Sequence, residues 1–316
     1  MRKSFQICLL GMLVVLPACQ QHDCVVNNSA SSPLQIEATV ANHGMSRTLV
    51  HADGKTSFTD GDQIGLFMSD VPQPIAWTLT GGVWQPERSL FWPNQTDAFD
   101  FFAYYPYESE AAEQTSVPMP DLSLQTGKVT DLGRYDFLTA HKQCTYSDNS
   151  GKVVFSGDAA FKHMYCLLMV TLVKEEGDAE TTLNTAHFEG TDFFTKHIYN
   201  FDVPGMQKPD DASSVNALDL NLSEVIPEEG VQIAVLINPT QVEVDLDFSI
   251  TYSRNGESLR ASTTALGNRI FVGGNCYKYK IVIQKGKLVI EGSEITDWNT
   301  EENLGDIIVN DELVRE

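Results

Sequence analysis

The sequence predicts an all-β protein made of sandwiches or barrels. Short apolar and β-branched runs recur along its 316 residues, and Gly and Pro turns separate them. No long stretch keeps the apolar spacing of an amphipathic helix. Strands are therefore expected at residues 34–40, 63–68, 77–79, 83–85, 99–105, 153–155, 167–173, 231–237, 242–251, 258–265, 277–284 and 287–291.

Two hairpins and one half-buried strand have the clearest local signals. Gly81-Gly82 and Lys285-Gly286 each separate two short strand-like runs, which is typical of a tight turn. Residues 242–250 alternate strictly between apolar and polar side chains. That alternation predicts a strand with one face in the core and one in water.

The aromatic run at residues 99–107 has two interpretations. Its rings could form a platform for sugars, because aromatic faces stack on apolar ligand surfaces. The favoured interpretation is a central strand that is buried on both faces and ends before Pro106. Three nearby tryptophans are expected in the same core: Trp77, Trp84 and Trp92.

The first 18 residues have the form of an export signal. A basic start precedes a mostly apolar stretch at residues 5–16, which is too short to span a membrane as a helix. Cys19 follows the small residue Ala18, as in the lipobox of a bacterial lipoprotein, where the thiol is acylated and becomes the first mature residue. The alternative is an ordinary secretory signal with a chance cysteine.

The length that remains, about 300 residues, suggests two domains. The boundary is expected near Ser156-Gly157-Asp158, between two strand-rich halves. The predicted division is a signal peptide (1–18), a flexible polar tether (19–33), an N-terminal β-sandwich (34–157), a C-terminal β-sandwich (158–300) and a C-terminal tail (301–316).

The charge of the chain restricts its partners. Its formal net charge is −22 at pH 7. Such an acidic surface repels the phosphate backbone, so nucleic acid is not expected as a partner. It also repels anionic lipid headgroups, so attachment to a membrane would depend on acyl chains at Cys19.

Four cysteines remain after the signal and Cys19, and no two of them form a close pair. Cys24, Cys144, Cys166 and Cys276 are scattered, which gives zinc or redox chemistry no support. Cys166 lies in an apolar run and is expected as a buried free thiol. A disulfide among the four is compatible with an oxidising compartment, but the sequence does not give its pairing.

A search for catalytic motifs finds none. The chain lacks a Gly-x-Ser-x-Gly elbow, a P-loop and a His-Glu-x-x-His pair. His163 has no second ligand at usable spacing, so a hydrogen-bonded structural histidine is favoured. Asp60-Gly61-Asp62 lacks the pattern of a calcium loop and is expected to form a turn. No enzymatic activity, cofactor or metal is therefore expected, although a chance pair of carboxylates could hide in so acidic a chain.

Several short motifs, in order, resemble the fimbrillin family of Bacteroidales. The resemblance covers about residues 36–300 and includes a Gly-Asp-x-Ile-Gly-x-Phe strand, a Trp-Pro and an Ala-Tyr-Tyr-Pro-Tyr strand. It implies two tandem transthyretin-like Greek-key β-sandwich domains and a subunit of a type V pilus. The segments that carry it are residues 58–67, Phe91-Trp92-Pro93, 101–107, 136–140, Phe161-Lys162-His163, 271–279 and Ile295-Thr296-Asp297-Trp298.

The resemblance also implies a route of assembly. In that family a lipoprotein precursor reaches the outer membrane, an arginine-specific protease removes the first strand, and the vacated groove accepts a strand from a neighbouring subunit. The matching cleavage position here is Arg47, although it could equally be an ordinary surface arginine. The candidate donor strand, residues 306–310, alternates poorly, which favours a tip or anchor role over a stalk role.

The expected function is therefore a structural and adhesive pilus component at the cell surface, with other pilus subunits and the outer membrane as partners. The alternative is a monomeric surface lipoprotein of the same fold that binds glycan or a host protein. Its binding regions would be two long connections, residues 108–133 and 204–217, because long loops in compact domains tend to be functional or mobile.

Overall fold

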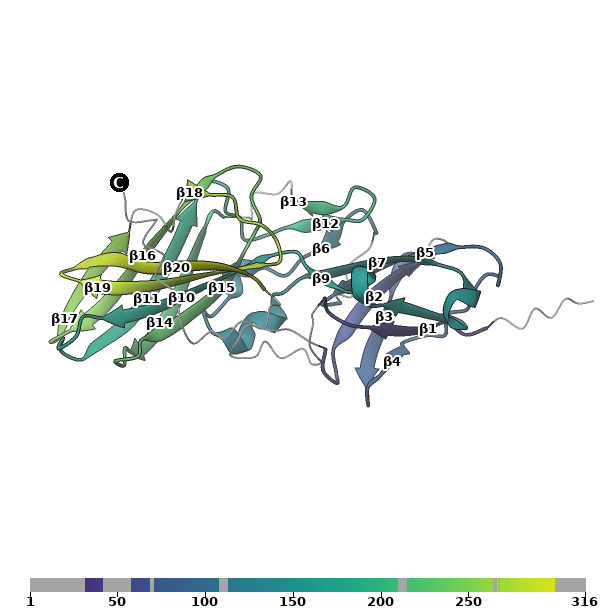
Figure 1. Ribbon diagram of the computed structural model, residues 1–316, viewed down its shortest axis with the longest axis horizontal. Coiled ribbons are helices and arrows are strands. Elements are labelled where there is room, and N and C mark those ends of the chain that lie inside the picture. The colour runs from purple at the N-terminus through teal and green to yellow at the C-terminus, as the bar shows by residue number, and fades with distance from the viewer. Residues whose placement is uncertain are drawn as a thin grey trace, which may run out of the picture.

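The computed structural model shows an elongated, nearly all-β molecule with two sandwich lobes (Figure 1). The predicted all-β fold is thereby confirmed. No helix among the described residues is long and apolar enough to cross a membrane. The structure describes residues 32–41, 58–68, 71–107, 113–209, 215–263, 266 and 268–298.

The first lobe has a six-stranded sheet at its centre. Its strands lie in the order β4-β3-β2-β5-β7-β9, and a separate parallel pair, β1-β8, packs in the same apolar core. The strand bounds are β1 Gln35–Ala38, β2 Gln63–Met68, β3 Val71–Thr80, β4 Val83–Pro86, β5 Phe99–Tyr105, β7 Leu138–Cys144, β8 Lys152–Phe155 and β9 Lys162–His163.

The second lobe is a sandwich of two sheets. One has the order β15-β10-β19-β20 and the other the order β14-β11-β16-β17, with β18 also paired to β16. Apolar side chains from both sheets form one core. The bounds are β10 Cys166–Lys174, β11 Thr181–Gly190, β14 Ala217–Val225, β15 Val231–Ile237, β16 Val244–Arg254, β17 Glu257–Thr263, β18 Asn268–Arg269, β19 Asn275–Gln284 and β20 Lys287–Asp297.

A small sheet and a third apolar cluster join the two lobes. The sheet has the order β13-β12-β6 and lies between the lobes in Figure 1. The cluster combines Phe67 and Tyr104 from the first lobe with Leu167 and Leu236 from the second. The remaining elements are β6 Val117–Pro118, β12 Ile198–Asn200, β13 Gly205–Gln207 and four 3-10 helices, η1 Leu122–Leu124, η2 Val129–Arg134, η3 Tyr146–Asn149 and η4 Gly157–Ala159.

The aromatic strand β5 is buried on both faces, which confirms the favoured interpretation. Phe101 and Tyr105 lie in the core of the first lobe, whereas Tyr104 lies in the cluster between the lobes. The strand ends before Pro106, as expected. The three tryptophans also lie in the core of the first lobe: Trp77, Trp84 and Trp92.

The Asp60-Gly61-Asp62 segment forms a turn, as expected. The carboxylate of Asp60 accepts hydrogen bonds from the backbone N–H groups of Gly81 and Gly82, at 3.0 and 3.3 Å. These contacts connect the turn to the β3–β4 hairpin. No group of side chains suited to a metal ion occurs among the described residues.

The division between residues 157 and 158 stays a prediction. The short strand β9 follows that position, yet it pairs with β7 in the sheet of the first lobe. The segment with β6 precedes that position, yet β6 pairs with β12 of the second half. Each half of the chain therefore contributes a short strand that pairs with a strand of the other half near the junction.

Candidate functional site

The first strand, β1, is the candidate site of strand exchange. It pairs only with β8 among the named strands of the described residues, in parallel, with Ile36 opposite Val153. Leu34, Ile36 and Val40 point into the core of the first lobe and are 4, 5 and 6% exposed. β1 thus places alternate apolar side chains in the core while it lies in a sheet of two strands.

Backbone hydrogen bonds hold both ends of this strand. Leu34 N donates to Leu90 O at 2.8 Å at the start. Thr39 N donates to Phe155 O at 2.9 Å, and Ala41 N donates to Phe161 O at 2.7 Å at the end. Main-chain bonds of this kind require no particular side chain, so a different strand could make them.

Ile36 of β1 and the flanking Leu34 and Val40 contribute much of the local stability. Full burial of one aliphatic side chain stabilises a fold by about 1.5–3 kcal/mol, so three contribute roughly 5–9 kcal/mol. A whole domain is stable by only about 5–15 kcal/mol. Without β1 the first lobe therefore needs another strand with apolar residues at alternate positions.

The outward face of β1 is polar and adds little. Glu37 forms an ion pair with Lys152 of β8, and both side chains are largely exposed. Exposed ion pairs typically contribute less than about 1 kcal/mol. Which strand can bind stably at this position therefore depends on its inward apolar side chains.

The residues predicted for lipidation and cleavage cannot be placed beside this strand. Cys19, Arg47 and the candidate donor segment at residues 306–310 lie outside the described residues. The described chain stops at Ala41 and resumes at Phe58, so Arg47 falls in the interval that follows the first strand. Both site assignments stay predictions.

The described cysteines are buried free thiols. Cys144, Cys166 and Cys276 form no disulfide with one another, and Cys24 lies outside the described residues. Burial raises the pKa of the Cys166 thiol well above its ordinary value and that of Cys276 to about 12. The expectation of a buried free thiol at Cys166 is confirmed.

His163 occupies a structural position at the junction of the lobes. Its Nδ1 lies 2.8 Å from Oδ2 of the fully buried Asp136. Its ring stacks on Trp298, with centroids 3.9 Å apart and planes at 16°. The favoured interpretation, a hydrogen-bonded structural histidine, agrees with this geometry.

The two long connections that were expected as functional loops meet in the small sheet between the lobes. β6 from the first and β13 from the second flank β12 on opposite sides. The first connection also covers an edge of the second lobe, because the amide of Gln125 bonds to both N and O of Leu236 in β15. Much of the first connection is therefore ordered structure.

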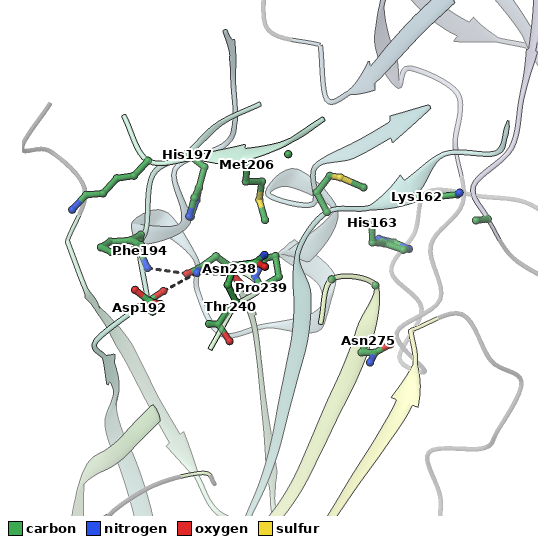
Figure 2. Close-up of a pocket in the computed structure, with 17 residues that line it drawn as sticks. Lys162, His163, Asp192, Phe194, His197, Met206, Asn238, Pro239, Thr240 and Asn275 are labelled. Atoms are coloured by element: carbon green, nitrogen blue, oxygen red, sulfur yellow. Dashed lines mark hydrogen bonds between the residues drawn. The ribbon is translucent and has the colours of Figure 1, made fainter. Parts of the chain in front are cut away.

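A cavity of about 760 Å³ lies at the junction of the lobes, beside the end of the first strand (Figure 2). Sequence reasoning missed it because its residues come from distant segments with no shared motif. Some of its residues lie in segments that the sequence analysis had named for other reasons: Lys162, His163 and Asn275 in the family motifs, and Met206 in the second long connection. Its wall includes Ala41, Lys162, His163, Asp192, Phe194, His197, Met206, Lys208, Asn238, Thr240 and Asn275.

Comparison with known proteins agrees with this architecture. The chain is 24% identical over 311 residues to the "Putative fimbrium subunit Fim1C" of Bacteroides uniformis, covering 94% of this chain and 96% of that protein. It is 28% identical over 191 residues to the "Putative fimbrium tip subunit Fim1C" of Bacteroides ovatus, covering 54% of this chain and 35% of that protein.

A solved structure supports the fold. A "putative cell adhesion protein from Bacteroides uniformis" superposes with a TM-score of 0.58 at 19% identity, covering 85% of this chain and 99% of that chain. The model of the fimbrillin-like family matches residues 48–298, which is most of the chain. The chain therefore belongs to the fimbrillin-like family.

Proposed function

We propose that this protein is a structural and adhesive subunit of a cell-surface pilus and that β1 is the strand exchanged during assembly. The observation that carries the proposal is that β1 pairs with one neighbouring strand, β8, while Ile36 of β1 and the flanking Leu34 and Val40 are buried in the core of the first lobe. Membership of the fimbrillin-like family and the names of the two fimbrium relatives support it.

Export and maturation follow from the two predicted sites. Acylation of Cys19 delivers the precursor to the outer membrane. Cleavage after Arg47 then releases the lipid together with the first strand and leaves an open groove beside β8. A strand from a neighbouring subunit fills that groove through main-chain hydrogen bonds and alternate apolar side chains.

Within the pilus, a tip or anchor position is favoured over a stalk position. A stalk subunit must both accept and donate a strand. Here the core of the first lobe takes up the alternate apolar side chains of the first strand, whereas the candidate donor segment, Asp306-Ile307-Ile308-Val309-Asn310, alternates poorly. A tip subunit accepts a strand without donating one, whereas an anchor that keeps Cys19 also keeps β1 and exchanges no strand at that position. The fimbrium tip relative from Bacteroides ovatus supports the tip position.

The second candidate function is a monomeric surface lipoprotein of the same fold that binds a glycan or a host protein. The cavity at the junction of the lobes favours this candidate, because it lies beside the second long connection. This form keeps Cys19 and β1 throughout and exchanges no strand.

The intact mass of the protein purified from the cell surface separates these candidates. If the proposed function is correct, the mature chain starts at Thr48 and is found in complexes that resist mild dissociation. Arg47→Ala should retain the acylated start at Cys19 and lose those complexes. Arg88→Ala is the matched control, because Arg88 is an exposed arginine outside the strands of the described residues. A wild-type protein that stays acylated at Cys19 and monomeric would refute strand exchange at β1.

A further inference from the structure

The segment that borders the first strand carries an excess of positive charge on a strongly acidic protein. Residues 152–162 pair with β1 and with the residues just after it, and they contain Lys152, Lys162 and a single carboxylate, Asp158. Residues 89–93, which contact the start of the strand on its other side, include no charged side chain. The whole chain has a formal net charge of −22 at pH 7. The surroundings of β1 therefore differ in charge from the rest of the molecule.

Lys152 is paired with a charge that belongs to β1 itself. It lies opposite Gln35 in the parallel ladder, and its Nζ forms an ion pair with the carboxylate of Glu37 on the outward face. This is its one ion pair among the described residues. When β1 leaves, Lys152 loses its carboxylate until the incoming strand supplies another.

Lys162 lies at the other end of the strand. Val40 forms a parallel bridge with Phe161, so the register places Lys162 beside Ala41, and both residues line the cavity at the junction of the lobes. Figure 2 shows Lys162 at one edge of that cavity. Lys162 is exposed and forms no ion pair within the part of the chain that the structure describes. The end of β1 thus lies beside a cation that β1 leaves unmatched.

The two lysines contact different parts of any strand that takes the place of β1. Gln35 and Ala41 are six positions apart. A strand rises about 3.3 Å per residue, so the two positions are roughly 20 Å apart. The Debye length in physiological salt is about 8 Å, and each lysine therefore acts on its own part of the strand.

We propose that the strand which replaces β1 is acidic on its outward face, with one carboxylate held by Lys152 and a second, just after its last inward apolar residue, held by Lys162. This inference rests on strand exchange at β1 and names the chemistry of the partner. The inward apolar residues decide how stably a strand binds, whereas exposed charges chiefly change how fast the correct partner associates. Because subunits of such high negative charge repel one another, local attraction at these lysines favours an acidic strand over a basic one.

Competition between two peptides tests this preference. The purified precursor is digested with an arginine-specific protease, which releases β1, in the presence of two synthetic peptides of residues 33–42 that carry different fluorophores. One peptide has Ala41→Glu, which puts a carboxylate near each lysine, and the other has Glu37→Lys and Ala41→Lys. Wild-type protein should capture at least about tenfold more of the acidic peptide at low salt, and this ratio should fall below about twofold in about 0.5 M NaCl.

Charge reversal in the protein separates attraction from a merely structural role of the lysines. The double variant with Lys152→Glu and Lys162→Glu should prefer the basic peptide, and each single variant should give an intermediate ratio, because the two positions act independently. Lys280→Glu is the matched control, since Lys280 forms an ion pair of similar exposure with Glu291 in the second lobe. It should keep the wild-type preference.

The outcomes distinguish this inference from strand exchange itself. Equal capture of the two peptides by wild type, or a preference for the acidic peptide that persists in the double variant, would overturn the acidic strand and leave strand exchange intact. Failure to capture either peptide would contradict strand exchange at β1, and this inference with it.

Purified pili give a second readout that needs no variant. A carbodiimide couples a lysine amine to a carboxylate in contact with it, so Lys152 should be coupled to Glu37 in the precursor and to a carboxylate of another subunit in pili. Lys162 should be coupled to the same segment of that subunit. If a crosslinker at residue 152 reaches another subunit in pili while neither lysine is coupled to it, the acidic strand is wrong and strand exchange stands.

Discussion

At the scale of single residues, the pairing of Gly65 with Tyr104 explains why two distant motifs occur together. The two residues are opposite each other in the β2–β5 ladder. A Cβ atom built on Gly65 would lie 2.3 Å from Cε1 of the fully buried Tyr104 ring. The glycine of the first motif therefore makes room for the tyrosine of the second.

Gly65→Ala should destabilise the protein by about 1–3 kcal/mol, because the added methyl overpacks this position. Urea unfolding of the purified chain measures the change. In a Tyr104→Ala background the same substitution should cost much less, since the clashing ring is gone. An equal cost in both backgrounds would show that Tyr104 is not the reason for the glycine.

The buried His197 should make stability depend on pH. Its pKa is about 4 in the folded protein and near 6.5 when unfolded, because burial penalises the charged form. Below pH 6.5 the imidazole of His197 is protonated in the unfolded chain but stays neutral in the folded chain. The contribution of His197 to the free energy of unfolding is therefore complete at pH 7 and is lost as the pH falls toward 4.

Comparison of wild type with His197→Phe isolates this effect from the many carboxylates. Between pH 7 and 4.5 the wild type should lose about 2 kcal/mol more stability than the variant, measured by urea unfolding. Parallel stability curves for the two proteins would indicate that His197 is solvated or paired in the folded state.

At the scale of secondary structure, substitutions on the two faces of β1 should differ sharply in how much they destabilise the protein. Ile36→Ala should destabilise the first lobe by about 2–4 kcal/mol, because it leaves a cavity in the core. The neighbouring Glu37→Ala should change stability by less than about 0.5 kcal/mol, because its side chain is exposed. Chemical unfolding of both variants measures the difference, and similar costs would argue against a core role for β1.

Two contacts from the first long connection cap the edge of β15. The Gly127 carbonyl accepts from Ala234 N at 2.8 Å, and the Gln125 amide accepts from Leu236 N at 2.6 Å and donates to Leu236 O at 3.0 Å. Gln125→Leu should leave both groups unpaired and accelerate hydrogen exchange of the Leu236 amide by at least tenfold. Gln143→Leu, at an exposed position on β7, should leave that exchange rate unchanged.

Strands with regular patterns could be predicted from the sequence, and strands with interrupted patterns could not. β2, β5 and β15 have the expected bounds because each is a compact apolar run. β11 was missed because its register shifts between Leu183 and Thr185, so Leu183 and Ala186 both face the core. β14 is an exception: it was missed although its leucines alternate regularly with polar residues.

The candidate site was predictable only in part for a similar reason. The first strand could be found from its own alternation. Its partner β8 and the end contacts at Leu90 and Phe161 lie far along the chain and depend on tertiary pairing. The cavity at the junction depends on residues from segments that are far apart in the chain, and tertiary folding alone brings them together.

At the scale of the whole molecule, the two lobes meet through a shared apolar cluster and through short strands of each half that pair with strands of the other half. β1 lies along β8, and the cavity lies at the junction, where Ala41 at the end of the first strand forms part of its wall. The central claim is that β1 is replaced by a strand of another subunit in the assembled fibre.

The most direct test is to identify the strand that lies beside β8 in purified pili. Lys152 faces Gln35 of β1 and is partly exposed, so a photo-crosslinking lysine analogue can replace it with little disturbance. In the unassembled precursor the crosslink should join residue 152 to the first strand of the same chain. In pili it should join residue 152 to a peptide from another subunit. A crosslink to residues 34–40 of the same chain in pili would contradict strand exchange at β1.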